Sequence, residues 1–286
     1  MHFLHDNKLK KMEETAVLIR EDIIKMLTAA GSGHSAGTLG LADIFTAFYF
    51  HILKHDPKKP NWSERDRLIL SNGHVCPVRY AAMARAGYFP KEKLVTLRRF
   101  GSPLQGHPEL DRLPGVETTS GPLGEGSSQA VGLAYAAKMD KAKWRVYCVL
   151  SDAELQEGQT WEAFMFAAKY KLNNCTFIVD RNFIQIGGNT EEVMPLEPLA
   201  KKFRAFGLHV EECAGNNIGD FVNAVNRAQQ VSDYPTIIIA YTIPGCGVEF
   251  MEGQFEWHGR VPNVTEAKQA LGELHTLQGQ LKNFHH

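Results

Sequence analysis

Two polar residues follow two apolar segments that are typical of buried strands. Asp152 lies just past the run at 144–150, and Asn182 lies just past the run at 175–180. One helix-like segment (160–171) separates the two runs, so we expect parallel neighbours whose carboxyl ends meet at one edge of a sheet. A carboxylate and an amide oxygen suit Mg²⁺ or Ca²⁺, and Mg²⁺ usually completes its octahedron with waters and phosphate oxygens. The spacing therefore indicates a diphosphate-bearing ligand held through a divalent ion.

A simpler interpretation of the same two residues needs no ligand. Aspartate is common at helix N-caps, so Asp152 could cap the helix that follows it, and Asn182 could form a turn. The paired placement favours the metal-binding interpretation, but the sequence alone leaves both open.

Four histidines fall in four separate loops: His34, His74, His107 and His258. A neutral imidazole both donates and accepts hydrogen bonds, and its charge changes near physiological pH. A single loop histidine is usually a surface residue. Four of them in loops expected at one edge of a sheet favour a shared site.

The loop "SGPLGEGSSQ" (120–129) contains three glycines, Gly121, Gly124 and Gly126. It does not match GxGxxG and does not directly follow a convincing strand, so a dinucleotide loop is poorly supported. Glycines here would allow the backbone to approach a flat ring closely. The alternative is a helix-entry turn with Ser127 as its cap, and both interpretations can hold together.

Alternating strand-like and helix-like segments must position these residues. The order predicts an α/β fold with a parallel sheet flanked by helices on both faces, and ligands in such sheets bind beyond the carboxyl ends of the strands. A first helix is expected around 12–26, with Asn7 as a possible cap and Gly31 as its stop, followed by a glycine-rich loop at 31–40. No stretch is typical of a linker, so we expect a single domain over 1–286. The expected strands are 67–70, 144–150, 175–180, 207–213 and 235–241, and the further helices are 41–53, 127–139, 160–171, 196–206 and 218–230.

Composition excludes several classes of protein. The 286 residues are 44% hydrophobic and 22% charged, with a formal net charge of −1, so nothing indicates a nucleic-acid or membrane partner. No apolar stretch approaches the length of a bilayer span, and the first residues do not resemble a signal peptide. The five cysteines are scattered without CxxC spacing, which argues against a disulfide framework or a zinc site and favours a cytoplasmic setting.

Several motifs in order along the chain resemble the transketolase family. The segment "SDAELQEGQTWEAFMFAAKYKLNNCTFIVDRNFIQIGG" resembles the family's thiamine diphosphate motif, which begins Gly-Asp-Gly and closes with an asparagine after a strand. "TTSGPLGEGSSQAVGLAYAAK" is similar to the loop and helix that pack against the cofactor. The histidine-bearing segments are also similar to those of the family: "GSGHSAGTLGLADI", "LSNGHVCPVRYA", "GSPLQGHPE" and "GCGVEFMEGQFEWHGRVPN".

The resemblance implies a cofactor site for thiamine diphosphate with Mg²⁺ (or Ca²⁺), in a thiamine-diphosphate-binding fold. Asp152, Asn182 and the backbone carbonyl of Ile184 would bind the metal, and the metal would hold the diphosphate. The four histidines would line the substrate channel and bind sugar hydroxyls, with Glu157 and Glu162 in a carboxylate network at a subunit contact. The other cofactor-binding residues that the resemblance implies are Gly121, Pro122, Leu123, Ala153 and Glu154.

The chain departs from the family pattern at two glycine-containing motifs. Ser151 and Ala153 replace the glycines that flank the aspartate, and Ser35 and Ala36 replace Pro-Gly after His34. The methyl group of Ala153 would be costly only at a positive φ. The hydroxyl of Ser151 could take part in binding where the family has bare backbone. We therefore expect cofactor binding to be retained.

The resemblance implies transfer of a two-carbon glycolaldehyde unit from a ketose donor to an aldehyde acceptor, with the cofactor performing the bond chemistry. The family's pyrimidine-binding domain is not recognisable in residues 1–286, so we expect it on a separate C-terminal subunit, in an α₂β₂ assembly. Two alternatives remain open: a 2-oxoacid dehydrogenase α subunit, and a non-catalytic subunit that has lost its cofactor. "ELQEGQTWEA" and the histidines argue against the first, whereas Ser151 and Ala153 favour the second. The donor and acceptor are not specified by the sequence.

Overall fold

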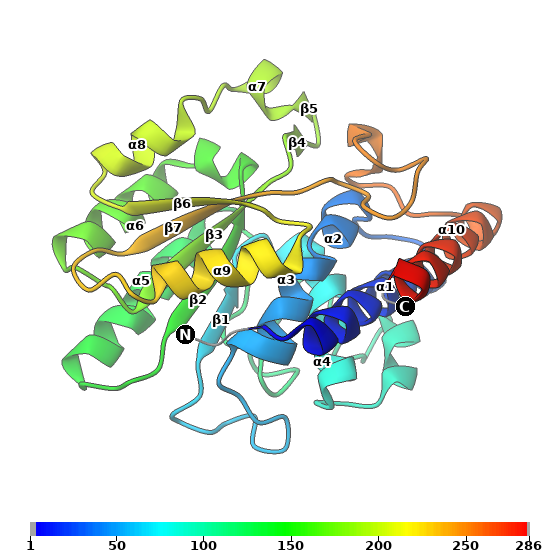
Figure 1. Cartoon of the computed structure of the whole chain (residues 1–286), viewed down its shortest axis with the longest axis horizontal. Helices are drawn as coiled ribbons and strands as arrows, with labels where there is room; N and C mark the ends of the chain where they lie inside the picture. Colours follow the sequence, from blue (N-terminus) through cyan, green and yellow to red (C-terminus); the bar gives the residue numbers. More distant parts are fainter. Residues whose placement is uncertain (1–3, 285–286) are drawn as a thin grey trace.

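A five-stranded, entirely parallel sheet forms the centre of the molecule (Figure 1). The computed structural model describes the backbone of residues 4–284 and the side chains of residues 4–277. The strand order is β1-β2-β3-β7-β6, so β6 forms the edge of the sheet and the last strand, β7, inserts between β3 and β6. The strands are β1 (Arg67–Leu70), β2 (Val146–Ser151), β3 (Cys175–Arg181), β6 (His209–Ala214) and β7 (Thr236–Tyr241), and a separate antiparallel hairpin joins β4 (Ile184–Gln185) to β5 (Gly188–Asn189). All five expected strands are confirmed, and none of their ends is shifted by more than two residues.

Helices cover both faces of the sheet, as the sequence predicted. Alternate residues of one strand enter different cores: Tyr147 and Val149 pack on one face, Cys148 and Leu150 on the other. This explains why the strands are continuously apolar instead of alternating. One face carries α1 (Asp6–Ala30), α2 (Ala36–Gly40), α3 (Ala42–Ala47), α4 (Cys76–Ala86) and α9 (Ile218–Ala228), and the other carries α5 (Glu125–Met139), α6 (Gly158–Lys169) and α8 (Leu199–Ala205).

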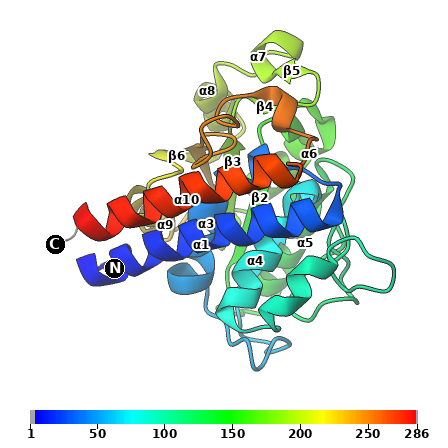
Figure 2. The same cartoon turned by 90° about the vertical axis from the view of Figure 1, so that its right-hand side faces the viewer.

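Two further helices lie outside these layers. Helix α10 (Val264–Phe284) runs along α1 at the edge of the molecule (Figure 2), and the short α7 (Thr190–Val193) follows the β4–β5 hairpin. In the described part of the chain, no helix combines the length and apolar character that crossing a bilayer requires.

The N-terminal part of the chain differs from the predictions in three details. Helix α1 begins at Asp6 with His5 in the N-cap position, so Asn7 does not cap it, although Gly31 (φ 65°) ends it as expected. Part of the expected glycine-rich loop is helical, because the buried segment Ala36–Gly40 forms α2. The expected helix at 41–53 divides into α3 and a π-helical turn over Phe48–Ile52.

The start of α5 packs tightly against the end of β1. Gly124 (φ 84°) takes the N-cap position, and Ser127 lies inside the helix, where its hydroxyl donates to the Gly124 carbonyl at 2.6 Å. The prediction of Ser127 as the cap was therefore wrong. A Cβ on Gly126 would lie 2.5 Å from the Cα of Ser71, so only glycine fits without moving the backbone.

We expect Gly126→Ala to lower the free energy of unfolding by about 1–3 kcal/mol, because the added methyl group overpacks the contact with Ser71. Gly132→Ala in the same helix is the matched control, since its Cβ would meet no atom within 4 Å. Its helix propensity should raise stability by about 0.5–1 kcal/mol. Urea denaturation of both variants measures the difference, and similar effects in the two would contradict the close contact.

Candidate active site

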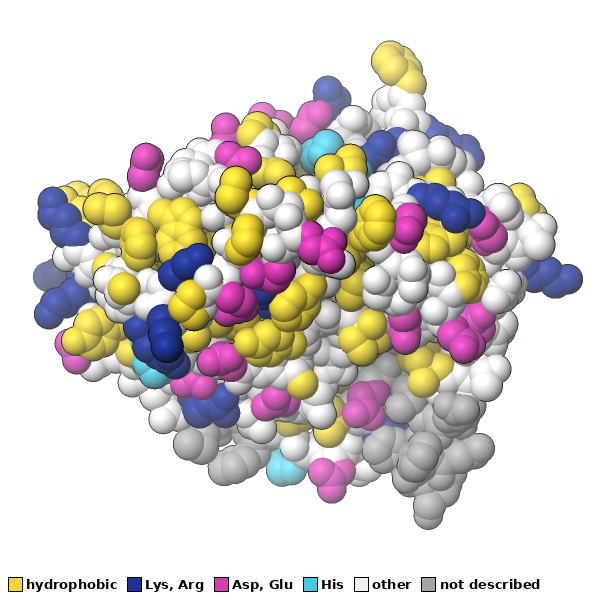
Figure 3. All heavy atoms as spheres, turned by 90° about the horizontal axis from the view of Figure 1, so that it is seen from above, with side chains coloured by type: hydrophobic (Ala, Val, Ile, Leu, Met, Phe, Trp, Pro, Cys, Tyr) yellow, Lys and Arg dark blue, Asp and Glu magenta, His cyan; other side chains and the backbone are white. Residues whose placement is uncertain are grey.

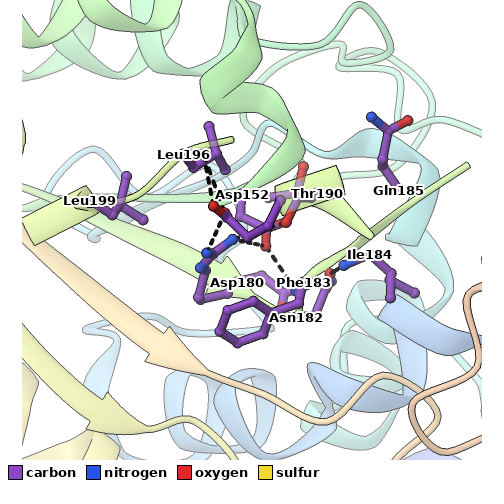
Figure 4. A network of polar contacts seen from close by, with 12 residues as sticks. Asp152, Asp180, Asn182, Phe183, Ile184, Gln185, Thr190, Leu196 and Leu199 are labelled. Carbon is purple, nitrogen blue, oxygen red and sulfur yellow. Dashed lines mark hydrogen bonds and ion pairs between the residues drawn. The ribbon is translucent and has the colours of Figure 1, made fainter. Parts of the chain in front are cut away.

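The carboxyl ends of β2 and β3 bring Asp152 and Asn182 to the same edge of the sheet. Ser151 pairs with Asp180 in parallel register, which confirms the predicted adjacency. Asp152 precedes a 3₁₀ turn at Ala153–Gln156, but its side chain makes no capping hydrogen bond, so the capping interpretation was wrong. Instead its Oδ2 accepts from Arg181 Nη1 at 2.9 Å and from the backbone N–H of Phe183 at 2.9 Å (Figure 4).

Asn182 forms the turn that the simpler interpretation predicted. Its Oδ1 accepts from the backbone N–H of Ile184 at 3.0 Å, and its Nδ2 donates to Asp180 Oδ2 at 2.8 Å (Figure 4). The hydroxyl of Thr242, just past β7, donates to the other oxygen of Asp180. These bonds fix the orientation of the Asn182 amide, and its oxygen keeps a second lone pair for a ligand.

The residues at this edge fit a divalent cation. Asp152 is fully buried, and its Oδ1 has no hydrogen-bond partner among the described residues, which is costly for a carboxylate oxygen unless a ligand satisfies it. In residues 4–277, no three His, Cys, Asp or Glu side chains converge as a metal cluster. The expected ligand set of a carboxylate, an amide and a carbonyl includes only one such side chain, so that finding does not conflict with it.

Burial affects the protonation of the two carboxyl groups at this edge. Burial raises the pKa of Asp152 to about 6, although the charge of Arg181 opposes this. Burial also raises the pKa of Asp180 to about 7, against the hydrogen bond from Thr242, while the charge of Asp152 adds to the increase. A positive charge bound nearby would lower the pKa of both carboxyl groups and so favour their ionised forms.

A cavity of about 480 Å³ opens next to these strand ends. It contains all four expected histidines and most of the other expected residues. Asp152 lies buried beneath it, while Pro122 and Glu154 are not among its lining residues, and Glu162 is exposed on α6. The predicted residues that line the cavity are His34, His74, His107, His258, Gly121, Leu123, Ala153, Glu157, Asn182 and Ile184.

Three of the histidines form a compact cluster. The ring centroids of His34 and His74 are 4.8 Å apart, those of His34 and His258 are 5.5 Å apart, and those of His74 and His258 are 5.2 Å apart. Burial lowers the pKa of His34 to about 4, with the charges of His258 and Arg98 adding to the effect. Burial likewise lowers the pKa values of His74, His107 and His258. The cluster is thus neutral at pH 7, and its rings can donate hydrogen bonds to hydroxyl groups and accept hydrogen bonds from them.

The carboxylate of Glu154 points into the protein instead of the cavity. It accepts from the Ser71 hydroxyl at 2.6 Å, from the Gly124 N–H at 2.8 Å and from the Ser151 N–H at 2.8 Å. Burial raises the pKa of Glu154, and these hydrogen bonds oppose the increase. Glu154 thereby joins the end of β1, the end of β2 and the start of α5, so only its backbone remains for contact with a cofactor.

Two of the departures from the family pattern cause no strain at this site. Ala153 is not among the described non-glycine residues with positive φ, so its methyl group has no backbone cost. The Ser151 hydroxyl accepts from the Glu154 N–H at 3.3 Å, a use of the hydroxyl within the protein itself.

Sequence reasoning missed three residues at this site: Asn72, Asp180 and Arg181. Asn72 lines the cavity, and both polar atoms of its buried amide lack partners among the described residues. It follows β1 as Asp152 follows β2, so the rule about strand ends could have found it. Asp180 and Arg181 were read as the end of an apolar strand, and nothing in their spacing predicts the ion pair of Arg181.

Comparison with known proteins identifies the family that the sequence motifs resemble, and the match covers most of the chain. The family model for the transketolase, thiamine diphosphate binding domain, matches residues 11–276. A 6-deoxy-6-sulfo-D-fructose transketolase subunit SqwG from Clostridium sp. is 41% identical over 263 residues, which cover 92% of this chain and 96% of that protein. An apulose-4-phosphate transketolase subunit from Actinobacillus succinogenes is 41% identical over 265 residues, with the same coverage of 92% and 96%.

Longer transketolases also match. Human transketolase is 35% identical over 276 residues, which are 96% of this chain but 44% of the human protein. The crystal structure of the Campylobacter jejuni transketolase superposes with a TM-score of 0.82 at 31% identity, covering 95% of this chain and 48% of that one. The chain therefore spans about half the length of these proteins.

The lowered pKa of His34 predicts a pH-dependent loss of stability. Because this pKa is about 4 in the folded chain and near 6.5 when unfolded, the unfolded chain binds more protons between these values, and stability falls as pH falls. We expect the wild type to lose on the order of 2 kcal/mol relative to His34→Gln between pH 7 and pH 4.5. Urea denaturation across this range tests it, with His5→Gln, at an exposed position, as control. Parallel pH profiles for wild type and His34→Gln would refute the prediction.

Proposed function

The chain belongs to the transketolase family through its thiamine diphosphate binding domain, and we propose that it is the N-terminal subunit of a split transketolase. It would transfer a two-carbon glycolaldehyde unit from a ketose to an aldehyde acceptor. The pyrimidine-binding domain would be supplied by a separate C-terminal subunit. One observation carries this proposal. A single cavity lies between the sheet edge, where Asp152 Oδ1 has no hydrogen-bond partner among the described residues, and a cluster of neutral histidines.

Each part of the cavity has a task in this reaction. Asp152, Asn182 and the carbonyl of Ile184 would hold Mg²⁺ (or Ca²⁺), and through it the diphosphate group. Bound thiamine diphosphate supplies the nucleophilic carbon that makes and breaks the ketol bond. Gly121 and Leu123 line the cavity, and a flat ring would pack against them.

The histidines would act on the sugar. At pH 7 their neutral rings would bind hydroxyl groups, orient the carbonyl and hold or return a proton at the hydroxyl oxygen. His34 Nδ1 is buried without a partner among the described residues, so it offers an unused hydrogen-bonding atom for this purpose. Glu157 at the cavity lining and Glu162 on α6 would join a carboxylate network at a subunit contact.

Exposed apolar side chains support a partner subunit. Ile186, which lines the cavity, is 76% exposed, Met194 is 58% exposed and Ile243 is 47% exposed. Figure 3 shows hydrophobic side chains gathered among charged ones on the face seen from above. We assign the surface around Ile186 and the cavity to the C-terminal subunit in an α₂β₂ assembly. The five free cysteines fit a cytoplasmic setting.

Arg98 supports an anionic sugar as substrate. Its side chain makes no hydrogen bond or ion pair with any residue in the described part of the chain, and its charge lowers the pKa values of His34 and His107 in the cavity. The two subunit relatives are named for a sulfonated and a phosphorylated sugar. We infer that this chain acts on a ketose or aldose with a phosphate or sulfonate group, which the charge of Arg98 would attract towards these histidines.

We expect thiamine diphosphate with Mg²⁺ to bind to the chain assembled with its C-terminal partner. Asp152→Ala should weaken this binding at least about 100-fold, beyond the ~10–100-fold typical of residues that only support a metal ligand. Isothermal titration calorimetry measures this, with Asp140→Asn as a control at the exposed C-terminal end of α5. Absence of binding by the wild-type assembly would favour the non-catalytic alternative.

The same assembly separates the two enzymatic alternatives. A transketolase should convert a ketose donor and an aldehyde acceptor and should leave 2-oxoacids unchanged. Turnover of a 2-oxoacid in preference to a ketose would instead favour a dehydrogenase-type α subunit.

Arg98→Gln should raise KM for a phosphorylated ketose roughly fivefold, because an exposed ion pair contributes about 1 kcal/mol or less. The KM for an unphosphorylated ketose should stay unchanged, since the charge then has no partner. Arg99→Gln, next to it on the exposed surface, is the matched control. Equal changes for both kinds of sugar would exclude an electrostatic role for Arg98.

A further inference from the structure

Arg181, the last residue of β3, is a fully buried cation at the edge of the sheet that holds the proposed metal site. Its side chain is 0% exposed, although a guanidinium in the interior is costly unless it is paired. Its Nη1 donates to Asp152 Oδ2 at 2.9 Å and to the Thr190 hydroxyl at 3.0 Å. Figure 4 shows this network around Asp152 and Thr190.

The other end of the guanidinium contacts two further carboxylates. Nη2 donates to Glu191 Oε1 at 2.7 Å and to Glu197 Oε1 at 3.0 Å. The ring of Phe183 covers the guanidinium, with the Arg181 Cζ 3.9 Å from the ring centroid. One positive charge therefore faces three carboxylates, so the network keeps a net negative charge that favours a nearby cation.

Arg181 also determines which oxygen of Asp152 is available. The bond from Arg181 and the bond from the Phe183 N–H both go to Oδ2. Oδ1 is buried and has no partner among the described residues. An aspartate held at one oxygen in this way cannot rotate freely, so the second oxygen stays in one place.

We propose that Arg181 is a positioning residue for the divalent cation: it holds Oδ2 of Asp152 so that Oδ1 stays free to bind the metal, while Glu191 and Glu197 offset its charge. This inference rests on the proposed function, because the cation it serves is the one that holds the cofactor's diphosphate. Without the two glutamates, the guanidinium would neutralise Asp152 and weaken its attraction for Mg²⁺. With them, the guanidinium orients Asp152 and the network keeps its net negative charge.

The same contacts tie the site to the segment after the β4–β5 hairpin. Glu191 also accepts from the backbone N–H groups of Leu196 and Glu197, and Glu197 Oε2 accepts from the Leu199 N–H at 2.7 Å. The position of this segment, which includes the exposed Met194, is therefore fixed by the cation-site network. A change at Arg181 should loosen the metal site and this segment together.

The sign of the effect of Arg181→Met tests the proposal. If Arg181 positions Asp152, Mg²⁺ affinity should fall roughly 10-fold or more, as for other groups that hold a metal ligand in place. If the guanidinium only competes as a positive charge, its removal should tighten Mg²⁺ binding and overturn the proposal. Calorimetric titration of Mg²⁺ at saturating thiamine diphosphate, in the assembly with the C-terminal subunit, measures the affinity. Limited proteolysis should show faster cleavage at 190–199 in the variant.

Further variants separate positioning from loss of folding. Arg85→Met removes a largely buried ion pair with Asp22, between α4 and α1, and should lower stability without changing Mg²⁺ affinity. Arg181→Lys should recover part of the lost affinity, because an ammonium group can still donate to Asp152. Glu191→Gln, at a partly exposed position, should weaken Mg²⁺ binding a few-fold by leaving the charge of Arg181 less offset.

Three outcomes are thus distinct. If the wild-type assembly binds no Mg²⁺ with thiamine diphosphate, the proposed function fails and the role of Arg181 fails with it. If the wild type binds and the folded Arg181→Met variant binds equally well or more tightly, the positioning role alone is wrong. If the affinity falls in Arg181→Met and stays unchanged in Arg85→Met, both stand.

Discussion

A buried carboxylate at the carboxyl end of β2 is the constraint on which the rest of the site depends. Asp152 is fully inaccessible, and an unpaired charge there would be strongly unfavourable. The protein satisfies one of its oxygens twice, with the Arg181 guanidinium and the Phe183 N–H. Phe183, which donates the second bond, adopts φ 63°, a conformation that non-glycine residues rarely take. A residue with a strained backbone therefore supplies a hydrogen bond to the buried carboxylate of Asp152. Such strain is common at functional sites.

The chain from the end of β3 to α8 is shaped by this charge. Asn182 makes its turn, Phe183 takes the left-handed conformation, and the β4–β5 hairpin brings the chain back so that Thr190 and Glu191 reach Arg181. A second carboxylate, that of Glu154, fixes other segments of the chain: its hydrogen bonds hold together the end of β1, the end of β2 and the start of α5. The two buried carboxylates divide the work: Glu154 is fully hydrogen-bonded and structural, whereas Asp152 keeps one oxygen unpaired.

The sequence was informative where a feature depends on chain periodicity and strand ends. The alternation of apolar runs predicted the sheet, and the strand ends predicted that Asp152 and Asn182 meet and that the loop histidines share one edge. Helix α4 was missed because it is buried nearly all round and shows no apolar stripe. Helix α10 was missed although Ala267, Ala270 and Leu274 have helical spacing. The partners of Arg181 and Glu154 could not be predicted, because no periodicity specifies how the loops fold back, and some partners, such as Ser71 for Glu154, lie in distant segments.

Ser151 and Ala153, which replace the family's glycines, are compatible with the backbone at this turn, and Ser151 forms hydrogen bonds with Glu154. Glycine is required beside a close ligand only if φ is positive or if a side chain would collide, and Ala153 begins a 3₁₀ turn without positive φ. Ser151 closes a ring with Glu154: its N–H donates to the carboxylate, and its hydroxyl accepts from the Glu154 N–H. The side chains at 151 and 154 thereby stiffen the turn that flexible glycines would leave mobile. A stiffer turn holds Asp152 in place before any ligand arrives, so the altered motif favours a preorganised site over a lost one.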